Sequence, residues 1–374
     1  MPFDVRTPLQ KSATFHFPIF DMSEGSNSNL WPRMRTIRIV IASVCSLLIL
    51  GGIFTYHQHP DVSLSRYLPT YPIQTWRQRV NDDYSFWATD GPSGSFRRRL
   101  AEYSPFHSNG PWTRNIIQSW RVLLNSSDEF FASWEDNNPD FNHVFFLDDE
   151  QDQCVRNISS HSLHEVGRTY FELLQKRIFR SDFFRYVAVW ALGGIWADVD
   201  TWNQQPFDEW IAYTGTPTTS LASLESQVGM VVGMEYDHFG NANWTSVCQY
   251  VFAAKPGHPV LLEIIAQIVE KAGDIANRLE EHQDFHDVEV LETTGPAFFT
   301  KIVTQWIKRR WDSSFNVHRD WHNLTEPKLF GDILVMPVWA FGAGRGWGPA
   351  PTLEDPRVCV GHQFQGSWIG GGGK

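Results

Sequence analysis

Cysteine is scarce in this 374-residue chain, which contains only Cys45, Cys154, Cys248 and Cys359. No Cys-x-x-Cys pair and no Cys/His spacing typical of a metal site occurs. Because Cys45 falls in an apolar run near the N-terminus, three cysteines remain for the body of the chain, and they allow at most one internal disulfide. A disulfide-rich scaffold and a cysteine-based metal centre are therefore excluded.

Positive charge is also in short supply, since 31 Lys and Arg stand against 42 Asp and Glu and give a net charge of −11. The body of the chain has no concentration of basic residues that could offset the repulsion from phosphates. Nucleic acid is therefore not an expected partner. Aromatic residues are abundant, with 17 Trp, and such flat side chains suit sugars and nucleobases as well as a protein core.

Charge is missing altogether from residues 39–56, IVIASVCSLLILGGIFTY. About 18 residues at about 1.5 Å each just span a hydrocarbon core. A cleaved signal peptide is the competing interpretation, but such peptides start near residue 1. We therefore predict a cytosolic tail over 1–36 and a transmembrane signal anchor over 37–56.

The charges that flank this run predict its orientation. Arg33, Arg35 and Arg38 precede it, whereas neutral or acidic residues follow, so the N-terminus is expected in the cytosol. The result is a single-pass type II protein with its bulk in a lumen, and so short a span suits the thinner membranes of the early secretory pathway. Mild support comes from four N-glycosylation acceptor sequences after the anchor, at Asn125, Asn157, Asn243 and Asn323.

After the predicted anchor, residues 57–110 are rich in proline and turn signals and are expected to form a stem that packs partly on the domain. From residue 111 to 369, short β-branched or aromatic runs alternate with helical patterns, including a helix over 168–192 and a strand over 194–201. This alternation predicts an α/β fold whose ligands gather at the carboxyl ends of strands. Residues 370–374 are expected to form a flexible tail.

The segment RSDFFRYVAVWALGGIWADVDTW, residues 180–202, holds the densest chemistry. Helical spacing predicts a buried helix that stops at Gly193-Gly194. In the strand that follows, alternate residues share a face. Alternation places Ile195, Ala197 and Val199 in the core. It places Trp196, Asp198 and Asp200 on the opposite face.

Upstream in the same segment, Asp182 and Arg185 are spaced i, i+3 and lie side by side on the helix. Carboxylates together with an arginine suit a site for Mg²⁺ or Mn²⁺ and a diphosphate, because hard ions take carboxylate oxygens and arginine offers a planar fork of donors. Two plainer alternatives remain open. A D-x-D triplet alone arises by chance about once in such a chain, and Asp182 with Arg185 also fits an ion pair on a helix surface.

The same segment closely resembles the D-x-D region of glycosyltransferase family 32, which includes the fungal Golgi α-1,6-mannosyltransferases that initiate outer chains on N-glycans. Further elements match in the family order: NIIQSW, SWEDNNPDFNHVFFLDDE, AKPGHPVLLEII, ETTGPAFFT, and DILVMPVWAFGAG followed by VGHQFQGSW. The resemblance implies a GT-A nucleotide-sugar-binding fold behind an N-terminal transmembrane helix. It also implies metal-dependent transfer of mannose from GDP-mannose, with retention, to N-linked glycans of glycoproteins in the Golgi, and membership in a Golgi mannosyltransferase complex.

The resemblance also implies roles for single residues. Asp200 corresponds to the direct ligand of Mn²⁺ or Mg²⁺, and Asp198 to the group that contacts ribose and, through water, the metal. Asp182 and Arg185 correspond to the pair that holds the donor sugar. Trp120 corresponds to the ring that stacks on the nucleobase, His362 to a second metal ligand, and Trp368 to the residue that closes the donor pocket. For each of these three residues an ordinary structural role stays open.

Two positions depart from the family pattern: Ile117 stands where His is usual before Gln118, and Trp196 stands where Tyr is common. The loop GAGRGWGPAPTLEDP is a candidate lid, with Arg345 available to the diphosphate, although an ordinary surface loop fits as well.

Other functions compete with the implied one. A phosphatase of the haloacid-dehalogenase kind also carries D-x-D-[TV] but needs later elements that are missing downstream. A metal-dependent sugar-binding protein would keep the same residues. Within the transferases, an inositol-phosphoceramide mannosyltransferase and an enzyme that uses a UDP-sugar are the rivals.

Overall fold

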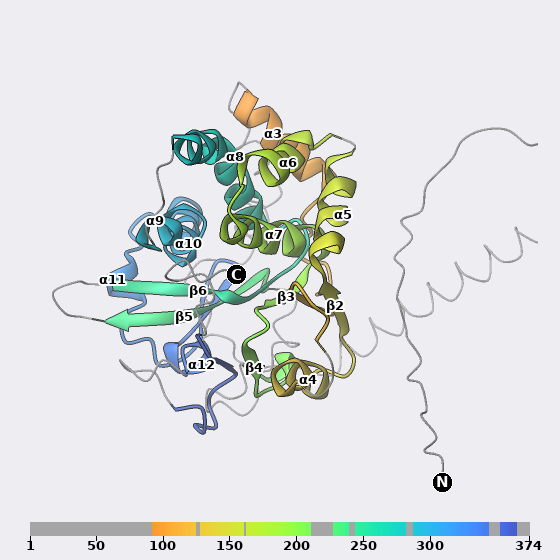
Figure 1. The fold of residues 1–374 in the computed structure, drawn as a ribbon. Helices are drawn as coiled ribbons and strands as arrows, with labels where there is room; N and C mark the ends of the chain where they lie inside the picture. The colour runs from red at the N-terminus through yellow and green to blue at the C-terminus, as the bar shows by residue number, and fades with distance from the viewer. Residues whose placement is uncertain are drawn as a thin grey trace, which may run out of the picture. The chain divides into compact units, whose positions relative to one another are not determined.

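The computed structural model describes residues 92–124, 128–160, 162–210, 227–238, 244–281, 287–343 and 352–364 (Figure 1). All of them belong to one unit, Val62–Lys374. The predicted anchor, Arg345, Trp368 and the C-terminal tail lie outside these ranges, and the membrane anchor stays a prediction. Within the ranges, no helix combines the length and the hydrophobicity that a bilayer crossing requires.

A mixed sheet of seven strands forms the centre of the described structure, in the order β2-β1-β3-β6-β5-β8-β7. β1 pairs in parallel with β2 and β3, and β5 pairs in parallel with β8, whereas β6 runs antiparallel to both β3 and β5, and β7 runs antiparallel to β8. The strands are β1 Asn115–Ser119, β2 Asn142–Phe146, β3 Gly194–Ala197, β5 Met230–His238, β6 Trp244–Ala254, β7 Lys328–Phe330 and β8 Ile333–Met336. The α/β alternation predicted from the sequence is confirmed.

Helices cover both faces of this sheet (Figure 1). On one face lie α3 Pro92–Tyr103, α5 Asp148–Ser159, α6 His164–Arg168, the π-helix η3 Thr169–Leu173, α7 Arg177–Leu192, α8 Pro259–Glu280 and α10 Pro296–Arg310. On the other face lie α4 Glu129–Asn137, the 3₁₀ turn η4 Phe207–Glu209, α12 Val338–Phe341, and a small sheet of β4 Thr201–Asn203 and β9 Val360–His362. Two further short helices of the described ranges are α9 Asp287–Thr293 and α11 Val317–Asp320.

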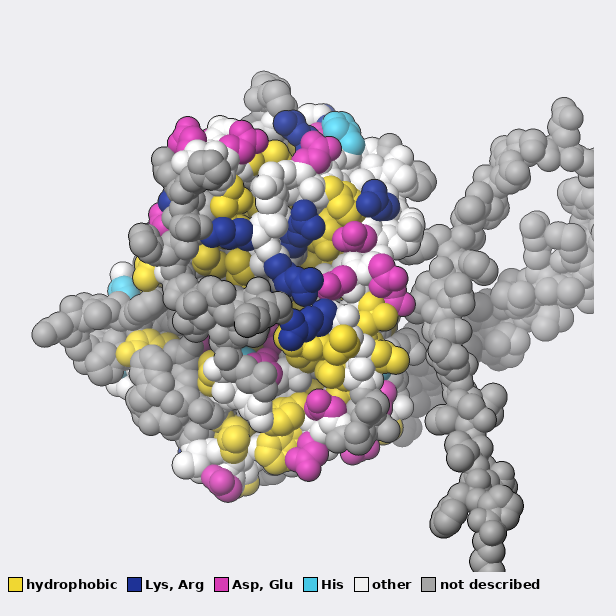
Figure 2. Space-filling view, in the orientation of Figure 1, with side chains coloured by type: hydrophobic (Ala, Val, Ile, Leu, Met, Phe, Trp, Pro, Cys, Tyr) yellow, Lys and Arg dark blue, Asp and Glu magenta, His cyan; other side chains and the backbone are white. Residues whose placement is uncertain are grey.

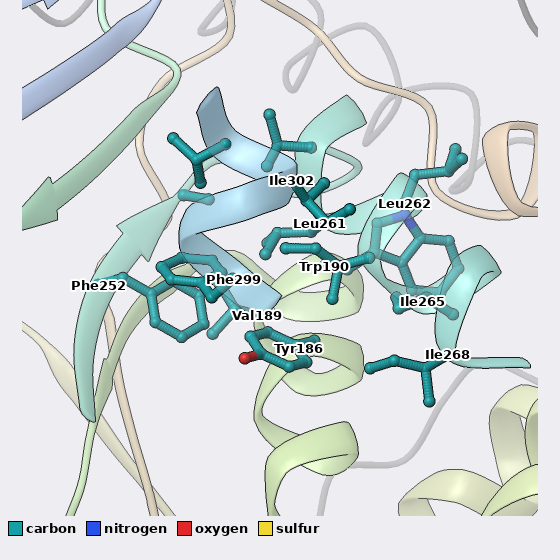
Figure 3. Packing of buried hydrophobic residues seen from close by; sticks show 14 of the residues in the cluster. Tyr186, Val189, Trp190, Phe252, Leu261, Leu262, Ile265, Ile268, Phe299 and Ile302 are labelled. Atoms are coloured by element: carbon teal, nitrogen blue, oxygen red, sulfur yellow. The ribbon is translucent and has the colours of Figure 1, made fainter. Parts of the chain in front are cut away.

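Helix α7 forms the centre of the larger core. Figure 3 shows Tyr186, Val189 and Trp190 of α7 packed against side chains of α8, α10 and β6. The ring of Tyr186 stacks on Phe299 with centroids 5.6 Å apart. Because this face of α7 is fully enclosed, the helix holds a fixed position against the sheet and fixes the polar residues at its other positions.

The strand after α7 is buried on both faces. Trp196 packs in the core on the α7 side, whereas Ile195 and Ala197 pack in the core on the α4 and α12 side. The predicted alternation is confirmed for these three residues. It is wrong for Val199, because β3 ends at Ala197 and the chain turns at 199–200. Val199 is only half-buried in this turn.

The continuous helix predicted over 168–192 is also interrupted. Its first part forms the end of α6 and the π-helix η3, and α7 begins only at Arg177. The guanidinium of Arg180 donates to the carbonyl oxygens of Leu174 and Phe171, at 2.7 and 3.3 Å. A side chain of the following helix therefore satisfies the carbonyl groups that the break leaves free, and helical periodicity does not reveal such a contact.

Glycine is required where α7 turns into β3, as the sequence predicted. Gly194 has φ +110, and an added Cβ would lie 2.4 Å from the carbonyl oxygen of Asn115. We expect Gly194→Ala to lower the free energy of unfolding by at least about 1–3 kcal/mol, because a strained backbone and a backbone clash coincide there. Chemical denaturation measures this change.

Gly273 provides the matched control for that substitution. It lies in α8, and a methyl group added there would meet no neighbouring atom within 4 Å. Gly273→Ala should raise the free energy of unfolding by about 0.5–1 kcal/mol, since alanine is the better helix former. Equal effects at the two positions would contradict the strained turn.

Cys154, Cys248 and Cys359 are free thiols. Burial raises the pKa of Cys154 to about 11, and it raises the pKa of Cys248 and of Cys359 further. A raised pKa means less thiolate at neutral pH, so in a Cys45→Ser protein we expect alkylation at pH 7.5 on the order of 10²-fold slower than for an exposed cysteine. Rapid labelling of the native protein, matching that of the denatured protein, would rule this out.

The face seen in Figure 2 carries Lys and Arg side chains interspersed with Asp and Glu around apolar patches. Side chains of both charge signs are therefore present on this face.

Candidate active site

The acidic pair lies at the carboxyl end of β3, where the central sheet meets the small sheet. Asp198 follows the last residue of β3, and its amide donates to the carbonyl oxygen of Tyr250 on β6 at 2.8 Å. Asp200 lies in the turn that leads into β4. The two aspartates are thus held by a strand end and a turn, and not by one continuous strand.

Arg185 on α7 contacts two of the predicted acidic residues, Asp182 and Asp198. Arg185 Nη1 lies 2.9 Å from Asp182 Oδ1, and Arg185 Nη2 lies 3.3 Å from Asp198 Oδ1. Trp196 Nε1 donates to the same Asp198 oxygen at 2.7 Å, so the indole supplies a polar contact where a tyrosine is common in the family. The predicted proximity of Asp182 and Arg185 is observed as a buried ion pair, not as one on the helix surface.

The charged groups of this cluster shift one another's pKa values. Burial raises the pKa of Asp182 and of Asp198, and Arg185 opposes this rise at both carboxyl groups. Burial disfavours the guanidinium charge, but Asp198 and Asp182 more than offset this and raise the pKa of Arg185. Arg185 therefore stays charged and limits the rise in the pKa of both enclosed carboxyl groups.

Asp182 has further partners that sequence reasoning missed. Gln249 Nε2 on β6 donates to Asp182 Oδ1 at 3.1 Å, and Thr294 Oγ1 donates to Asp182 Oδ2 at 2.7 Å. Thr294 belongs to the ETTGPAFFT element, so the resemblance marked its neighbourhood without a role. Gln249 had no such signal, because only the pairing of β6 with β3 brings it here.

The small sheet brings a distant histidine to the second aspartate. Strand β4 pairs antiparallel with β9, and Thr201 lies opposite His362. His362 Nε2 then lies 3.1 Å from Asp200 Oδ1, and its ring packs 4.0 Å from that of Tyr250. The Nδ1 atom of His362 is buried and makes no hydrogen bond to the described residues. The structure thus joins two residues that are 162 positions apart in the sequence.

A divalent cation fits this donor set. One carboxylate oxygen and one imidazole nitrogen face each other, with side chains 18% and 11% exposed, so both can reach an ion at the surface of the site. The described residues contain no group of three or more His, Cys, Asp or Glu arranged as a metal centre. Magnesium and manganese sites commonly use one or two carboxylates and take their other ligands from phosphates and water. Asp198 is already held by nitrogen donors from Arg185 and Trp196.

The predicted nucleobase-stacking ring lies at the same edge of the sheet. Trp120 comes directly after β1, is half-buried, and lies 5.4 Å from the guanidinium of Arg121. Because β1 runs parallel to β3, with Ile117 opposite Trp196, the carboxyl ends of both strands meet at one edge. The nucleobase role stays a prediction, as does the role of Trp368, which lies outside the described ranges.

One departure from the family pattern lies in the core. Ile117 is fully buried, so the residue that replaces the usual histidine packs against apolar side chains. Its neighbour Gln118 is also buried and contacts His143 Nε2 through Oε1 at 2.7 Å. A histidine therefore still lies beside Gln118, although it comes from β2.

Comparison with known proteins adds relatives of described function. Residues 125–216 match the family described as "Glycosyltransferase sugar-binding region containing DXD motif". Proteins named initiation-specific alpha-1,6-mannosyltransferase are 28% identical in Candida albicans (73% of this chain, 76% of the relative) and 29% identical in Schizosaccharomyces pombe (71% and 65%). A Saccharomyces cerevisiae protein of the same name is 22% identical (87% and 94%).

Among solved structures, the PaToxG glycosyltransferase matches with 13% identity and a TM-score of 0.33, over 62% of this chain and 78% of that one. The Asp198-Val199-Asp200 triplet lies within residues 125–216, the region that matches the family of glycosyltransferase sugar-binding regions containing a DXD motif.

Proposed function

We propose that this chain is a metal-dependent, retaining mannosyltransferase of GT-A architecture, which transfers mannose from GDP-mannose in α-1,6 linkage to N-glycans of glycoproteins in the Golgi. The observation that carries the proposal is the meeting of Asp198, Asp200, His362 and Arg185 at one edge of the sheet. The named relatives support the sugar and the linkage. The predicted anchor over 37–56 supports the location.

Asp200 and His362 are the residues that would hold the cation, with Asp198 nearby and engaged by Arg185. When bound, a divalent cation neutralises charge on a diphosphate leaving group. Asp200 would offer a carboxylate oxygen to the ion, and His362 would offer the lone pair of Nε2.

Arg185 contributes the fixed positive charge of the site. Its two terminal nitrogens are held by Asp182 and Asp198, and its Nε is buried without a hydrogen bond to the described residues. A preorganised guanidinium can donate to a phosphate or to sugar hydroxyls without first losing rotamer freedom. The chain thus stabilises negative charge that develops on the departing nucleoside diphosphate.

The proposed bond changes are those of a glycosyl transfer. An acceptor hydroxyl oxygen bonds to the anomeric carbon while the bond from that carbon to the diphosphate oxygen breaks. The hydroxyl proton passes to the leaving diphosphate. Spacing in the sequence gives no protein nucleophile, which is compatible with this route, and retention rests on the family resemblance alone. Positioning of the acceptor would supply the rest of the rate enhancement.

A panel of donors and metals tests this function. The full-length chain in detergent would be given GDP-mannose, UDP-glucose, UDP-galactose or UDP-N-acetylglucosamine with Mn²⁺, Mg²⁺ or EDTA, and with an N-glycan or inositol-phosphoceramide as acceptor. We expect metal-dependent mannose transfer to the N-glycan and an α-1,6 linkage by NMR. Transfer to the lipid alone, or from a UDP-sugar alone, would replace the proposed substrate, and donor binding without any turnover would favour a sugar-binding protein.

A further inference from the structure

The Asp182 carboxylate is surrounded by donors from three parts of the fold. It accepts from Arg185 on α7, from Gln249 on β6 and from Thr294 in the turn before α10. The side chain of Asp182 is only 1% exposed. Three donors thus occupy the carboxylate within the core, where an unmade hydrogen bond is costly.

The donors themselves are anchored by a tyrosine on α7. The hydroxyl of Tyr186 contacts Gln249 Oε1 and lies 2.8 Å from the carbonyl oxygen of Thr294. Figure 3 shows the ring of Tyr186 packed beside Phe252 and Phe299, so apolar contacts fix the position of this hydroxyl. The carboxylate is therefore connected to a rigid part of the core.

On the other side, Asp182 determines where Arg185 points. One terminal nitrogen of the guanidinium contacts Asp182 and the other contacts Asp198, at 2.9 and 3.3 Å. A planar group held at both ends has one orientation. If Asp182 turned or lost a donor, the guanidinium would lose the contact that directs it toward the DXD motif.

We infer that Thr294 and Gln249 are positioning residues that act through Asp182, and that Asp182 orients Arg185 toward the DXD motif. This inference rests on the proposed function. The described donors contact both Asp182 oxygens, so a change at Thr294 or Gln249 reaches Arg185 through this carboxylate.

Thr294→Val tests the inference because it keeps the shape of the side chain and removes the hydroxyl. Hydrogen bonds to charged groups are the stronger ones, so we expect kcat to fall about 10- to 100-fold with little change in the donor KM. Thr294→Ser restores the hydroxyl and should recover most of kcat. Thr300→Val is the control, because Thr300 Oγ1 accepts from the Val247 amide and donates to the Pro296 carbonyl oxygen, both main-chain groups, and not to Asp182. It should leave kcat within about twofold.

A double-mutant cycle separates positioning from general destabilisation. If Thr294 acts through Asp182, Thr294→Val should change kcat less than about twofold in an Asp182→Asn background. Independent, multiplying effects would overturn the inference, and so would a folded Thr294→Ser variant that stays as slow as Thr294→Val. If Asp182→Asn fails to fold, the Ser and Val comparison alone decides.

Failure of the inference can be told apart from failure of the proposed function. If the wild-type chain uses another sugar, the same variants are compared with that sugar. Crystal structures of Thr294→Val and Thr294→Ser give a readout that needs no activity. Arg185 should lose its contact with Asp198 in the valine variant only, and an unchanged Arg185 in both would overturn the inference.

Discussion

Replacing Asp200 with alanine is expected to abolish transfer, with kcat/KM lower by at least about 10³-fold, while the protein stays folded. The reason is that Asp200 is the carboxylate closest to His362 and has an 18% exposed side chain, so it serves the proposed ion more than the core. Losing several kcal/mol of charge stabilisation corresponds to a loss of this size. Initial rates with saturating Mn²⁺ and the midpoint of thermal unfolding are the measurements.

Asp355→Ala is the matched control for Asp200→Ala. Asp355 has a 21% exposed side chain and pairs with Arg357 at the surface, so its loss should cost no more than about 1 kcal/mol of stability and leave transfer intact. Near-normal mannose transfer by Asp200→Ala, or by wild-type protein freed of metal, would end the proposal of a metal-dependent site.

Replacing Arg185 with methionine is expected to remove both activity and stability. Asp182 and Asp198 would lose the cation that lies between them, and breaking a buried pair on one side costs about 3–5 kcal/mol. Burial already raises the pKa of both carboxyl groups, and loss of Arg185 would raise each pKa further. Chemical denaturation and initial rates would measure the two effects.

The sign of the pH dependence follows from those raised pKa values. A carboxyl group whose pKa is higher in the folded state destabilises the fold when it ionises, so its contribution to stability is lost as the pH rises through that folded-state pKa. The free energy of unfolding that Arg185→Met loses relative to wild type should therefore be largest near pH 7.5 and smaller near pH 5.5. A constant deficit would contradict this assignment.

Arg114→Met serves as the control for that charge deletion. Arg114 has a 41% exposed side chain and pairs with Asp140 and Asp208 at the surface. Its loss should lower stability by no more than about 1 kcal/mol, without the pH trend. The activity and the stability of Arg185→Lys should lie between those of wild type and Arg185→Met, because lysine keeps the charge but lacks the planar fork of donors.

The sequence predicted best those features that depend on residues close together in the chain. The stop of α7 at Gly193 and the sides taken by Ile195, Trp196 and Ala197 follow from helical and strand periodicity and from the need for positive φ. The proximity of Asp182 to Arg185 follows from one turn of helix. In these cases neighbouring residues determine the outcome.

The remaining features depend on contacts that no local pattern encodes. Val199 leaves the core because β3 ends before it, and the bond of the Asp198 amide to Tyr250 comes from the neighbouring strand. His362 reaches Asp200 only through the pairing of β4 with β9. Gln249 and Thr294 gather around Asp182 because β6 and the turn before α10 meet at α7.

The most direct test of the metal site is diffraction from crystals grown with Mn²⁺ and GDP, recorded for the anomalous signal of manganese. We predict one manganese ion within bonding distance of Asp200 Oδ1 and His362 Nε2, with GDP phosphate oxygens as further ligands. Bound GDP with no manganese at these two side chains, or manganese bound elsewhere on the chain, would contradict the account.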